Sequence, residues 1–547
     1  MPTAKSGAAL VCDILADEGV RHVFGNPGTT ELPLMHALGE RSDLQFVLGL
    51  QESTVIGMAD GYGRATGRPA FVSVHANAGL GNAMGGLTNA IAHRAPMVVS
   101  AGNADRRHAV ADPLLSGDLV RLAEGAVKSG EQVERTDDLA VVLRRAFTAA
   151  AAPPRGPVLV SLPSDVLDGD SAGAPYPARS DRRAPAATGV AEAARLLAEA
   201  AGEVAIVAGD AVTDADALAE LVLLAELLGA PVYGAPFHAR RAFPANHPLW
   251  SGTLEARADA IRSTLTPFRR VLLVDHQAFL VYPYSEGSPL PVGTELLHLS
   301  PEERQVGRVH PTRIGMVGEV RAALTEIAQA IQHLGELPSA RPGLTRATDV
   351  AADRVRATDE TVQRRWSASP THPMAAAAAL LAGLPAESIV VDEAVTTGAY
   401  LRGLHRTDGP LSYWFCRGGG LGWGMPAGLG ISLATGGEPV LVVVGDGSAM
   451  YSPQALWTAA REELPVLFAV VDNGEYAILK QHLRRRGSTS EVGMNLGGPA
   501  MDFVDLARSM GVSSSRAETP DEVSEQVAAN WGRGPHLVHV PIAAPTH

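Results

Sequence analysis

The sequence has little cysteine and no long apolar run. Only Cys12 and Cys416 carry thiols in 547 residues, too few for a disulfide framework or a four-thiolate zinc site. This cysteine usage fits a reducing compartment, so we expect a cytoplasmic protein. No charge-free stretch reaches the roughly 18 apolar residues that a membrane helix needs. We therefore predict no membrane span.

Positive charge is also scarce. Lys and Arg total 45 against 59 Asp and Glu, which gives a net charge of −14. This balance argues against a nucleic-acid partner bound through a broad basic face. With 46% hydrophobic and 19% charged residues, the chain can form large cores and is too apolar to be mostly disordered. The composition favours a soluble enzyme or scaffold.

Short apolar runs alternate with helix-like stretches along the chain, a pattern typical of parallel sheets covered by helices. We predict an α/β fold of three tandem modules, each a doubly wound parallel sheet, over residues 1–180, 181–340 and 341–547. The first boundary is placed in a Pro- and Ala-rich stretch, and the second in a polar stretch that includes a charged helix near residues 350–366.

Polar side chains follow several strands predicted in the first module. Thr29, Glu52 and His75 each come after an apolar run, and the carboxyl ends of parallel strands form the edge where open α/β sheets bind ligands. Each residue also has a structural explanation. Thr29 fits a helix cap, Glu52 a carboxylate stabilised by a helix dipole, and His75 a hydrogen-bonded core histidine.

The strongest motif is the pair VLVVVGDGS and PVLFAVVDNGEY. Asn473 follows Asp446 by 27 residues, and a right-handed crossover of that length brings both to the same edge of neighbouring parallel strands. A carboxylate and an amide oxygen suit Mg²⁺, which completes its shell with phosphate oxygens and water. Gly445 and Gly447 would let the backbone approach a diphosphate at the start of the next helix. The alternative is a solvated turn with Asp446 as helix cap.

These motifs resemble those of the thiamin diphosphate-dependent enzymes, and within that family the benzoylformate decarboxylases. FGNPGTTELPL, LQESTVIGMADGYGRATGRPA and HANAGLGNAMGGL precede FCRGGGLGWGMPAGLGISLA and the GDG motif, in the family's order. The resemblance implies pyrimidine-binding, middle and diphosphate-binding modules that hold thiamin diphosphate and Mg²⁺. It also implies a homotetramer, built as a dimer of dimers, with active sites at the dimer interface.

The resemblance assigns roles to individual positions. Glu52 would contact the aminopyrimidine nitrogen and promote removal of the thiazolium C2 proton. His75 would bind substrate and transfer protons, and Thr29, where relatives have serine, would contact the substrate carboxylate. The implied cofactor-binding residues are Gly419, Leu421, Gly445, Asp446, Gly447, Ser448, Asn473, Glu475 and Tyr476. Of these, Asp446, Asn473 and the backbone carbonyl of Glu475 would bind the metal.

Departures from the family cluster where substrate specificity resides. Pro283 stands where the relatives have a second active-site histidine, so its proton donation would be lost, or be taken over by water, His276 or His238. Arg417 introduces a cation where relatives have a small residue. We expect a pocket more polar than that of the relatives. Its implied residues are Thr29, His75, Phe415, Ile478, Leu479 and His482.

The resemblance implies non-oxidative decarboxylation of an aryl or related 2-oxo acid to an aldehyde and CO₂. A carboligase similar to acetolactate synthase or benzaldehyde lyase, which forms a 2-hydroxyketone, is the alternative, because loss of the second histidine would slow protonation. A non-catalytic protein with this fold would lack cofactor residues that are present here.

We expect no nicotinamide site, since Pro426 interrupts the G-x-G-x-x-A run from Gly422, and no flavin site in the middle module.

Overall fold

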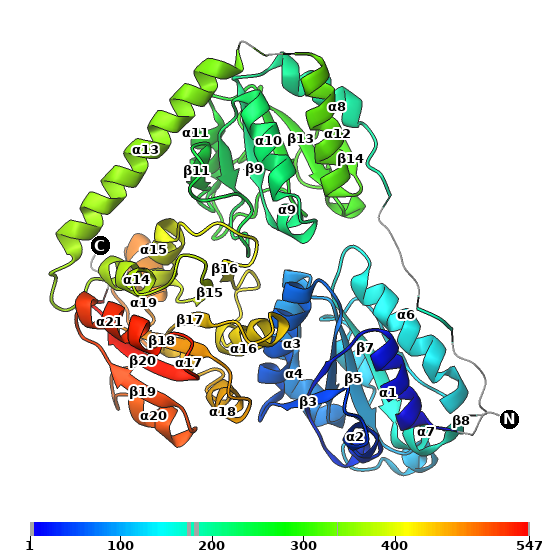
Figure 1. The fold of residues 1–547 in the computed structure, drawn as a ribbon. Helices are drawn as coiled ribbons and strands as arrows, with labels where there is room; N and C mark the ends of the chain where they lie inside the picture. Colours follow the sequence, from blue (N-terminus) through cyan, green and yellow to red (C-terminus); the bar gives the residue numbers. More distant parts are fainter. Residues whose placement is uncertain (1–4, 172–176, 180–184, 336, 338, 545–547) are drawn as a thin grey trace. The chain divides into compact units, whose positions relative to one another are not determined.

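The computed structural model describes residues 5–171, 177–179, 185–335, 337 and 339–544 (Figure 1). The chain divides into two compact units. The first unit comprises residues 1–182, 391–396 and 416–547, and the second comprises residues 183–390 and 397–415. The module boundary predicted at residue 180 lies outside the described residues. The boundaries at residues 180 and 340 stay predictions.

A six-stranded parallel sheet forms the centre of the first module, in the order β3-β2-β4-β5-β7-β6. Its inner strands β4, β5 and β7 are buried at every position, as a sheet covered on both faces requires, whereas the edge strands β3 and β6 are partly exposed. The strands are β2 (His22–Asn26), β3 (Gln45–Leu48), β4 (Ala70–Val74), β5 (Met97–Asn103), β6 (Gly130–Gln132) and β7 (Pro157–Pro163). The helices are α1 (Gly7–Asp17), α2 (Leu32–Gly39), α3 (Glu52–Thr66), α4 (Ala76–His93), α5 (Leu119–Ala123), α6 (Leu139–Ala151) and α7 (Ser164–Asp168). A short antiparallel pair joins β1 (Lys5–Ser6) to β8 (Asp170–Ser171).

The middle module repeats the architecture, with strand order β11-β10-β9-β12-β13-β14 and parallel pairing throughout. The strands are β9 (Val204–Ala208), β10 (Val232–Gly234), β11 (Trp250–Thr253), β12 (Arg270–Val274), β13 (Glu295–Ser300) and β14 (Ile314–Val317). The helices are α8 (Val190–Glu199), α9 (Asp210–Asp214), α10 (Leu218–Leu228), α11 (Ala258–Leu265) and α12 (Val320–His333), followed by the long α13 (Ala340–Arg365). The charged helix predicted near residues 350–366 is therefore part of a longer element.

The sheet of the third module has the order β16-β15-β17-β18-β20-β19. Its strands are β15 (Ile389–Glu393), β16 (Tyr413–Phe415), β17 (Val440–Gly445), β18 (Val466–Asp472), β19 (Ser513–Arg516) and β20 (His536–Pro541). The helices are α14 (Pro373–Ala382), α15 (Thr396–Leu404), α16 (Gly424–Ala434), α17 (Asp446–Ala449), α18 (Gln454–Arg461), α19 (Ala477–Arg485), α20 (Phe503–Ser509) and α21 (Pro520–Asn530). The three parallel sheets confirm the predicted fold class.

Helices α3 and α16 lie side by side within the first unit (Figure 1). Glycines allow this contact, because a methyl group at Gly61 would overlap the backbone of Ala427, and one at Gly430 would overlap the carbonyl of Met58. The helix backbones therefore touch without intervening side chains. No helix in the described part of the chain is long and apolar enough to cross a membrane.

This contact generates a stability prediction. Gly430→Ala should lower the free energy of unfolding by about 1–3 kcal/mol, because the new methyl group has to displace the α3 backbone. The control is Gly81→Ala in α4, where an added Cβ meets nothing within 4 Å. That change should be neutral or stabilise by about 0.5–1 kcal/mol. Denaturant unfolding measures both, and equal midpoints for the two variants would contradict the packing.

Candidate active site

Glu52 is the first residue of α3 and is buried. The Asn26 side-chain amide donates to Glu52 Oε1 over 3.0 Å, and the Asn82 amide donates to Oε2 over 3.1 Å. Asn26 ends β2, and Asn82 lies in α4. Each carboxylate oxygen is therefore fixed by a different element of the first module. This leaves lone pairs on both oxygens for a further partner.

His75 follows β4 and is held by a buried carboxylate that the sequence analysis missed. Glu31 Oε2 lies 2.8 Å from His75 Nδ1 and accepts from the Gly28 amide over 2.8 Å. Glu31 is only 2% exposed, and a methyl group at Gly102 in β5 would overlap it. With Nδ1–H donated to Glu31, the imidazole Nε2 becomes an acceptor. A capping-box pattern, in which glutamate follows Gly28 by three residues, is the signal that points to Glu31.

The hydroxyl beside His75 is that of Thr30. Thr30 Oγ1 donates to Glu31 Oε1 over 2.6 Å and lies 3.1 Å from His75 Nδ1, whereas Thr29 is exposed at the start of a 3-10 turn. Helix α2 begins after that turn, and Glu31 rather than Thr29 occupies its N-cap position. Ala76 has φ +46°, a left-handed conformation that is uncommon outside glycine and concentrates at functional sites.

The strand order of the first sheet reverses between β2 and β4. In α/β folds such a reversal opens a crevice at the carboxyl ends of the two strands, where ligands bind. Asn26 ends the first of these strands, and His75 follows the second. The polar cluster of Glu31, Glu52 and His75 therefore occupies the edge of the sheet that topology favours for a ligand.

Asp446 opens α17 directly after β17, and β18 pairs alongside, with Gly445 opposite Val471. This confirms the predicted crossover. The Gly447 and Gly474 amides donate to the two Asp446 oxygens, each over 2.8 Å. Burial, reinforced by nearby Asp472, raises the pKa of Asp446 to about 6. A neighbouring cation would favour its ionised form.

The turn after β18 is ordered by its own backbone and by a buried lysine. Asn473 Oδ1 accepts from the Glu475 amide over 3.1 Å. The side chain of Glu475 bonds to Lys480, which also lies 3.1 Å from Glu491. Lys480 is a second residue that the sequence analysis missed. Because the Glu475 side chain is occupied in this way, any ligand role of Glu475 would fall to its backbone.

The Tyr476 ring covers Gly447. A Cβ at position 447 would lie 2.5 Å from Tyr476 Cε1, so only glycine fits beneath the ring. Ser448 is buried in the same short helix, α17. Since Gly447 has no side chain, no side chain of this residue covers the backbone at the start of α17.

The glycine-rich loop before α16 is held by Glu393, at the end of β15. Its Oε1 accepts from the Gly422 and Trp423 amides over 2.7 and 3.2 Å, and its Oε2 accepts from the Gly424 amide over 2.7 Å. The loop also carries Gly419 and the half-buried Leu421. The third sheet reverses its strand order between β15 and β17, so Glu393 and Asp446 flank the second topological switch point. The sequence analysis missed Glu393, and an acidic residue at the end of the apolar strand IVVDE is the signal that points to it.

The first module holds the same loop from the other side. Asn89 in α4 donates to the Gly420 carbonyl over 2.8 Å and accepts from the Gly420 amide over 2.9 Å. His93 Nε2 accepts from the Gly418 amide over 3.1 Å, while its Nδ1 lies 2.6 Å from buried Asp60 in α3. Side chains from two modules of one chain therefore fix the loop backbone.

The other predicted pocket residues lie in both units. Ile478 and His482 are half-buried, and Leu479 is 45% exposed, on α19 of the first unit. Phe415 belongs to the second unit, where its ring stacks on Phe237 with centroids 6.3 Å apart. Arg417 is half-buried in the first unit.

The histidines considered as replacements at Pro283 are engaged within the middle module. His238 is buried and bonds to the Ala235 carbonyl over 2.7 Å, and burial lowers its pKa to about 3. His276 lies 2.9 Å from both Asp214 and Glu302. Since His238 is neutral near pH 7 and His276 is held by carboxylates, neither replaces the missing histidine without rearrangement.

Comparisons with known proteins match all three modules. The family model "Thiamine pyrophosphate enzyme, N-terminal TPP binding domain" matches residues 5–122. The models of the family's central domain and C-terminal TPP binding domain match residues 190–327 and 396–540. The chain belongs to the thiamin pyrophosphate enzyme family. The predicted family resemblance is thereby confirmed.

Individual relatives of this thiamin pyrophosphate enzyme span nearly its whole length. Benzoylformate decarboxylase of Pseudomonas aeruginosa is 33% identical over 539 residues and covers 97% of each chain. The acetolactate synthase large subunit of Haemophilus influenzae is 27% identical over 565 residues, covering 98% of this chain and 94% of its own.

Two solved structures are also similar to this thiamin pyrophosphate enzyme. Benzoylformate decarboxylase of Polynucleobacter necessarius superposes with TM-score 0.88 at 27% identity and 99% coverage of each chain. The thiamine diphosphate-dependent 4-hydroxybenzoylformate decarboxylase of Rhodococcus jostii RHA1 superposes with TM-score 0.87 at 28% identity, covering 99% of this chain and 100% of its own.

Titration of Glu393 yields a pH prediction. Burial raises the pKa of Glu393 from 4.5 to about 7, although three amides oppose the shift. Because the folded-state pKa is the higher one, the stability due to the neutral carboxyl is fully present below pH 4.5 and is lost as the pH rises through about 7. Between pH 4.5 and about 7, the free energy of unfolding of the wild type should fall by about 2–3 kcal/mol more than that of Glu393→Gln.

Unfolding of both proteins in denaturant at several pH values measures this difference. Glu40→Gln, which changes an exposed carboxylate on the first module, is the matched control and should stay parallel to the wild type. A difference between wild type and Glu393→Gln that does not change with pH would contradict the assigned titration.

Proposed function

We propose that this thiamin pyrophosphate enzyme decarboxylates an aryl or related 2-oxo acid to an aldehyde and CO₂ without oxidation. The observation that carries the proposal is the pairing of His75 with buried Glu31 beside Glu52, at the reversal of strand order in the first sheet. The benzoylformate decarboxylase relatives support an aryl substrate. We further propose a cytoplasmic homotetramer with active sites at its dimer interfaces.

The residues of the third module fit a diphosphate with Mg²⁺. Asp446 has a buried carboxylate with one amide donor on each oxygen, which leaves lone pairs for a cation. Asn473 and the backbone carbonyl of Glu475 would supply two further oxygens, the ligand type that Mg²⁺ prefers. In the described residues no group of three or more His, Cys, Asp and Glu side chains forms a metal cluster, and the diphosphate oxygens of the cofactor with water would complete the shell.

The proposed cofactor contacts extend over two glycine-rich segments. Gly445, Gly447 and Ser448 would face the diphosphate, with the backbone of α17 opening toward its charge. Gly419 and Leu421 would lie against the rings, and Tyr476 would close the edge over Gly447. When bound, thiamin diphosphate supplies a carbanion nucleophile at C2 and accepts the electrons that CO₂ leaves behind.

The chain's own residues then bind and move protons. Glu52, fixed by its two asparagine donors, would hold the proton shared with the aminopyrimidine nitrogen. His75 would give or take a proton at Nε2, and the carboxylate of Glu31 would stabilise the charged imidazole. Thr29 would contact the substrate carboxylate.

The substrate pocket would combine His75 and Thr29 with apolar and polar side chains from the third module. Ile478 and Leu479 would contact the organic group of the substrate. His482 and Arg417 would make this pocket more polar than that of the relatives. A 2-oxo acid with a polar substituent on its organic group therefore suits the pocket better than benzoylformate itself.

Carboligation is a second candidate. Pro283 has no titratable group at the position of the second histidine, and neither His238 nor His276 is free to replace it. Slow protonation would leave time for attack on an aldehyde, and acetolactate synthases are among the relatives.

A substrate panel tests the proposal. The enzyme, loaded with thiamin diphosphate and Mg²⁺, is given aryl and alkyl 2-oxo acids with and without added aldehyde. Release of CO₂ and aldehyde from aryl 2-oxo acids is expected, with the fastest turnover for a ring carrying a polar substituent. Hydroxyketone as the main product would assign the chain to the carboligases, and no CO₂ from any 2-oxo acid would overturn the proposal.

Glu52→Gln should lower kcat by about 10²–10⁴-fold, because an amide has no acidic proton to share with the cofactor. The substitution preserves side-chain size, so the unfolding midpoint should change little. Glu124→Gln, at an exposed carboxylate of the same module, is the matched control and should keep full activity. Undiminished turnover in Glu52→Gln would rule out the assigned proton transfer.

A further inference from the structure

The second unit contains a cavity of about 350 Å³ between β11, α13 and α15. Arg354, Arg402 and Arg406 line it, and none of its described lining residues is acidic. Trp250, Met374 and Tyr400 add apolar and aromatic surface. The cavity is therefore both cationic and partly apolar.

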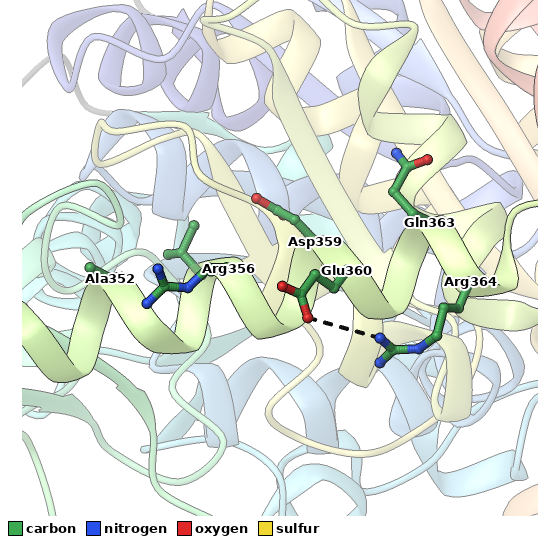
Figure 2. A pocket seen from close by; sticks show the side chains of 7 residues that line it. Ala352, Arg356, Asp359, Glu360, Gln363 and Arg364 are labelled. Carbon is green, nitrogen blue, oxygen red and sulfur yellow. Dashed lines mark ion pairs between the residues drawn. The ribbon is translucent and has the colours of Figure 1, made fainter.

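The outer face of α13 has a different character. Figure 2 shows a hollow there whose lining residues all belong to α13, with Glu360 paired to Arg364 at 3.9 Å. Arg356, on this face, pairs with Asp353. Asp359, the remaining charged residue of the hollow, pairs with Arg406, so every charged side chain that lines the hollow has a partner of opposite charge.

Two of the three lining arginines have no acidic partner. Arg354 Nη2 donates to the Trp250 carbonyl over 2.7 Å, and the Arg402 guanidinium lies 4.0 Å from the centre of the Phe415 ring. Neither forms an ion pair with any described carboxylate, whereas Arg406 binds Asp359 over 2.6 Å. Both unpaired guanidinium groups are half-buried and held in place by neutral groups.

A third unpaired cation lies next to the cavity. Arg241 is 2% exposed, and its Nη2 donates to His405 Nδ1 over 2.8 Å and to the His405 carbonyl over 3.0 Å. No described carboxylate lies within ion-pair distance of it. A buried charge without a counter-ion is costly. Burial lowers the pKa of Arg241 to about 10, and the nearby charge of Arg402 acts in the same direction.

His405 connects this buried cation to the cavity that it lines. Because its Nδ1 accepts from Arg241, the ring proton resides on Nε2, and that buried donor has no hydrogen-bond partner among the described residues. Burial and Arg241 lower the pKa of His405 to about 3, so the ring is neutral. A buried donor without a partner indicates a missing acceptor.

We propose that this cavity binds a phosphate monoester with a small apolar group. The phosphate would lie between Arg354 and Arg402, near His405 Nε2, and the apolar group would contact Trp250 and Tyr400. A dianion matches a cluster of unpaired cations better than a monoanion does, and guanidinium groups bind phosphate through paired hydrogen bonds. The cavity volume is at the small end of ligand sites, which favours a small ester.

Titration calorimetry at constant ionic strength tests the site, with phenyl phosphate as probe and benzoate as monoanionic comparison. The enzyme is loaded with thiamin diphosphate and Mg²⁺, so that the cofactor site is filled. Phenyl phosphate should bind the wild type at least about tenfold more tightly than benzoate. Arg354→Met and Arg402→Met should each weaken phenyl phosphate binding by about tenfold or more.

Arg356→Met, on the outer face of α13, is the matched control and should bind as the wild type does. Arg402→Lys keeps the positive charge but lacks the paired donors, so its affinity for phenyl phosphate should lie between those of the wild type and Arg402→Met. This variant keeps the test valid if Arg402→Met unfolds. Equal binding of benzoate, or equal losses in Arg354→Met and Arg356→Met, would overturn the proposal. Because binding is measured rather than turnover, failure here leaves the proposed decarboxylation untouched.

Discussion

The backbone contact between α3 and α16 is the constraint on which both candidate sites depend. Helix α3 begins with Glu52 and carries Asp60 two turns later, and α16 begins directly after the glycine-rich loop. Since glycines bring the two helices into contact without side chains between them, there is little room for either helix to slide. The position of the loop is therefore tied to the helix that carries Glu52.

Buried carboxylates complete this arrangement through main-chain amides. Glu393 receives three amides of the loop, Glu31 receives that of Gly28, and Asp446 receives two at the turns after β17 and β18. In each case a strand end or the turn beyond it is fixed by hydrogen bonds from main-chain amides to carboxyl oxygens. The glycine-rich segments, which have little side-chain packing of their own, gain definite positions in this way.

The first and third sheets share one strand order, whereas the middle sheet has the different order β11-β10-β9-β12-β13-β14. The sheets also differ in the groups that lie where the strand order reverses. In the first and third modules, polar side chains and glycine-rich segments gather there. In the middle module, Asp210 accepts from the Ala239 and Arg240 amides, and a methyl group at Gly209 would overlap Asp275. Its own polar groups fill that edge. Two of the three parallel sheets thus carry ligand-type edges, and the middle sheet fills its edge with its own side chains.

The sequence by itself determined the parallel α/β modules, the family and the edge residues Asp446, Glu52 and His75, because strand periodicity and glycine spacing are local properties. Only the tertiary structure decided that Glu31 orients His75, that Glu393 and Asn89 hold the loop, and that Arg241 has no acidic partner among the described residues. Those contacts join residues far apart in the chain. Their side-chain types also occur in ordinary caps and surfaces, so no local pattern marks them before the sheets and helices assemble.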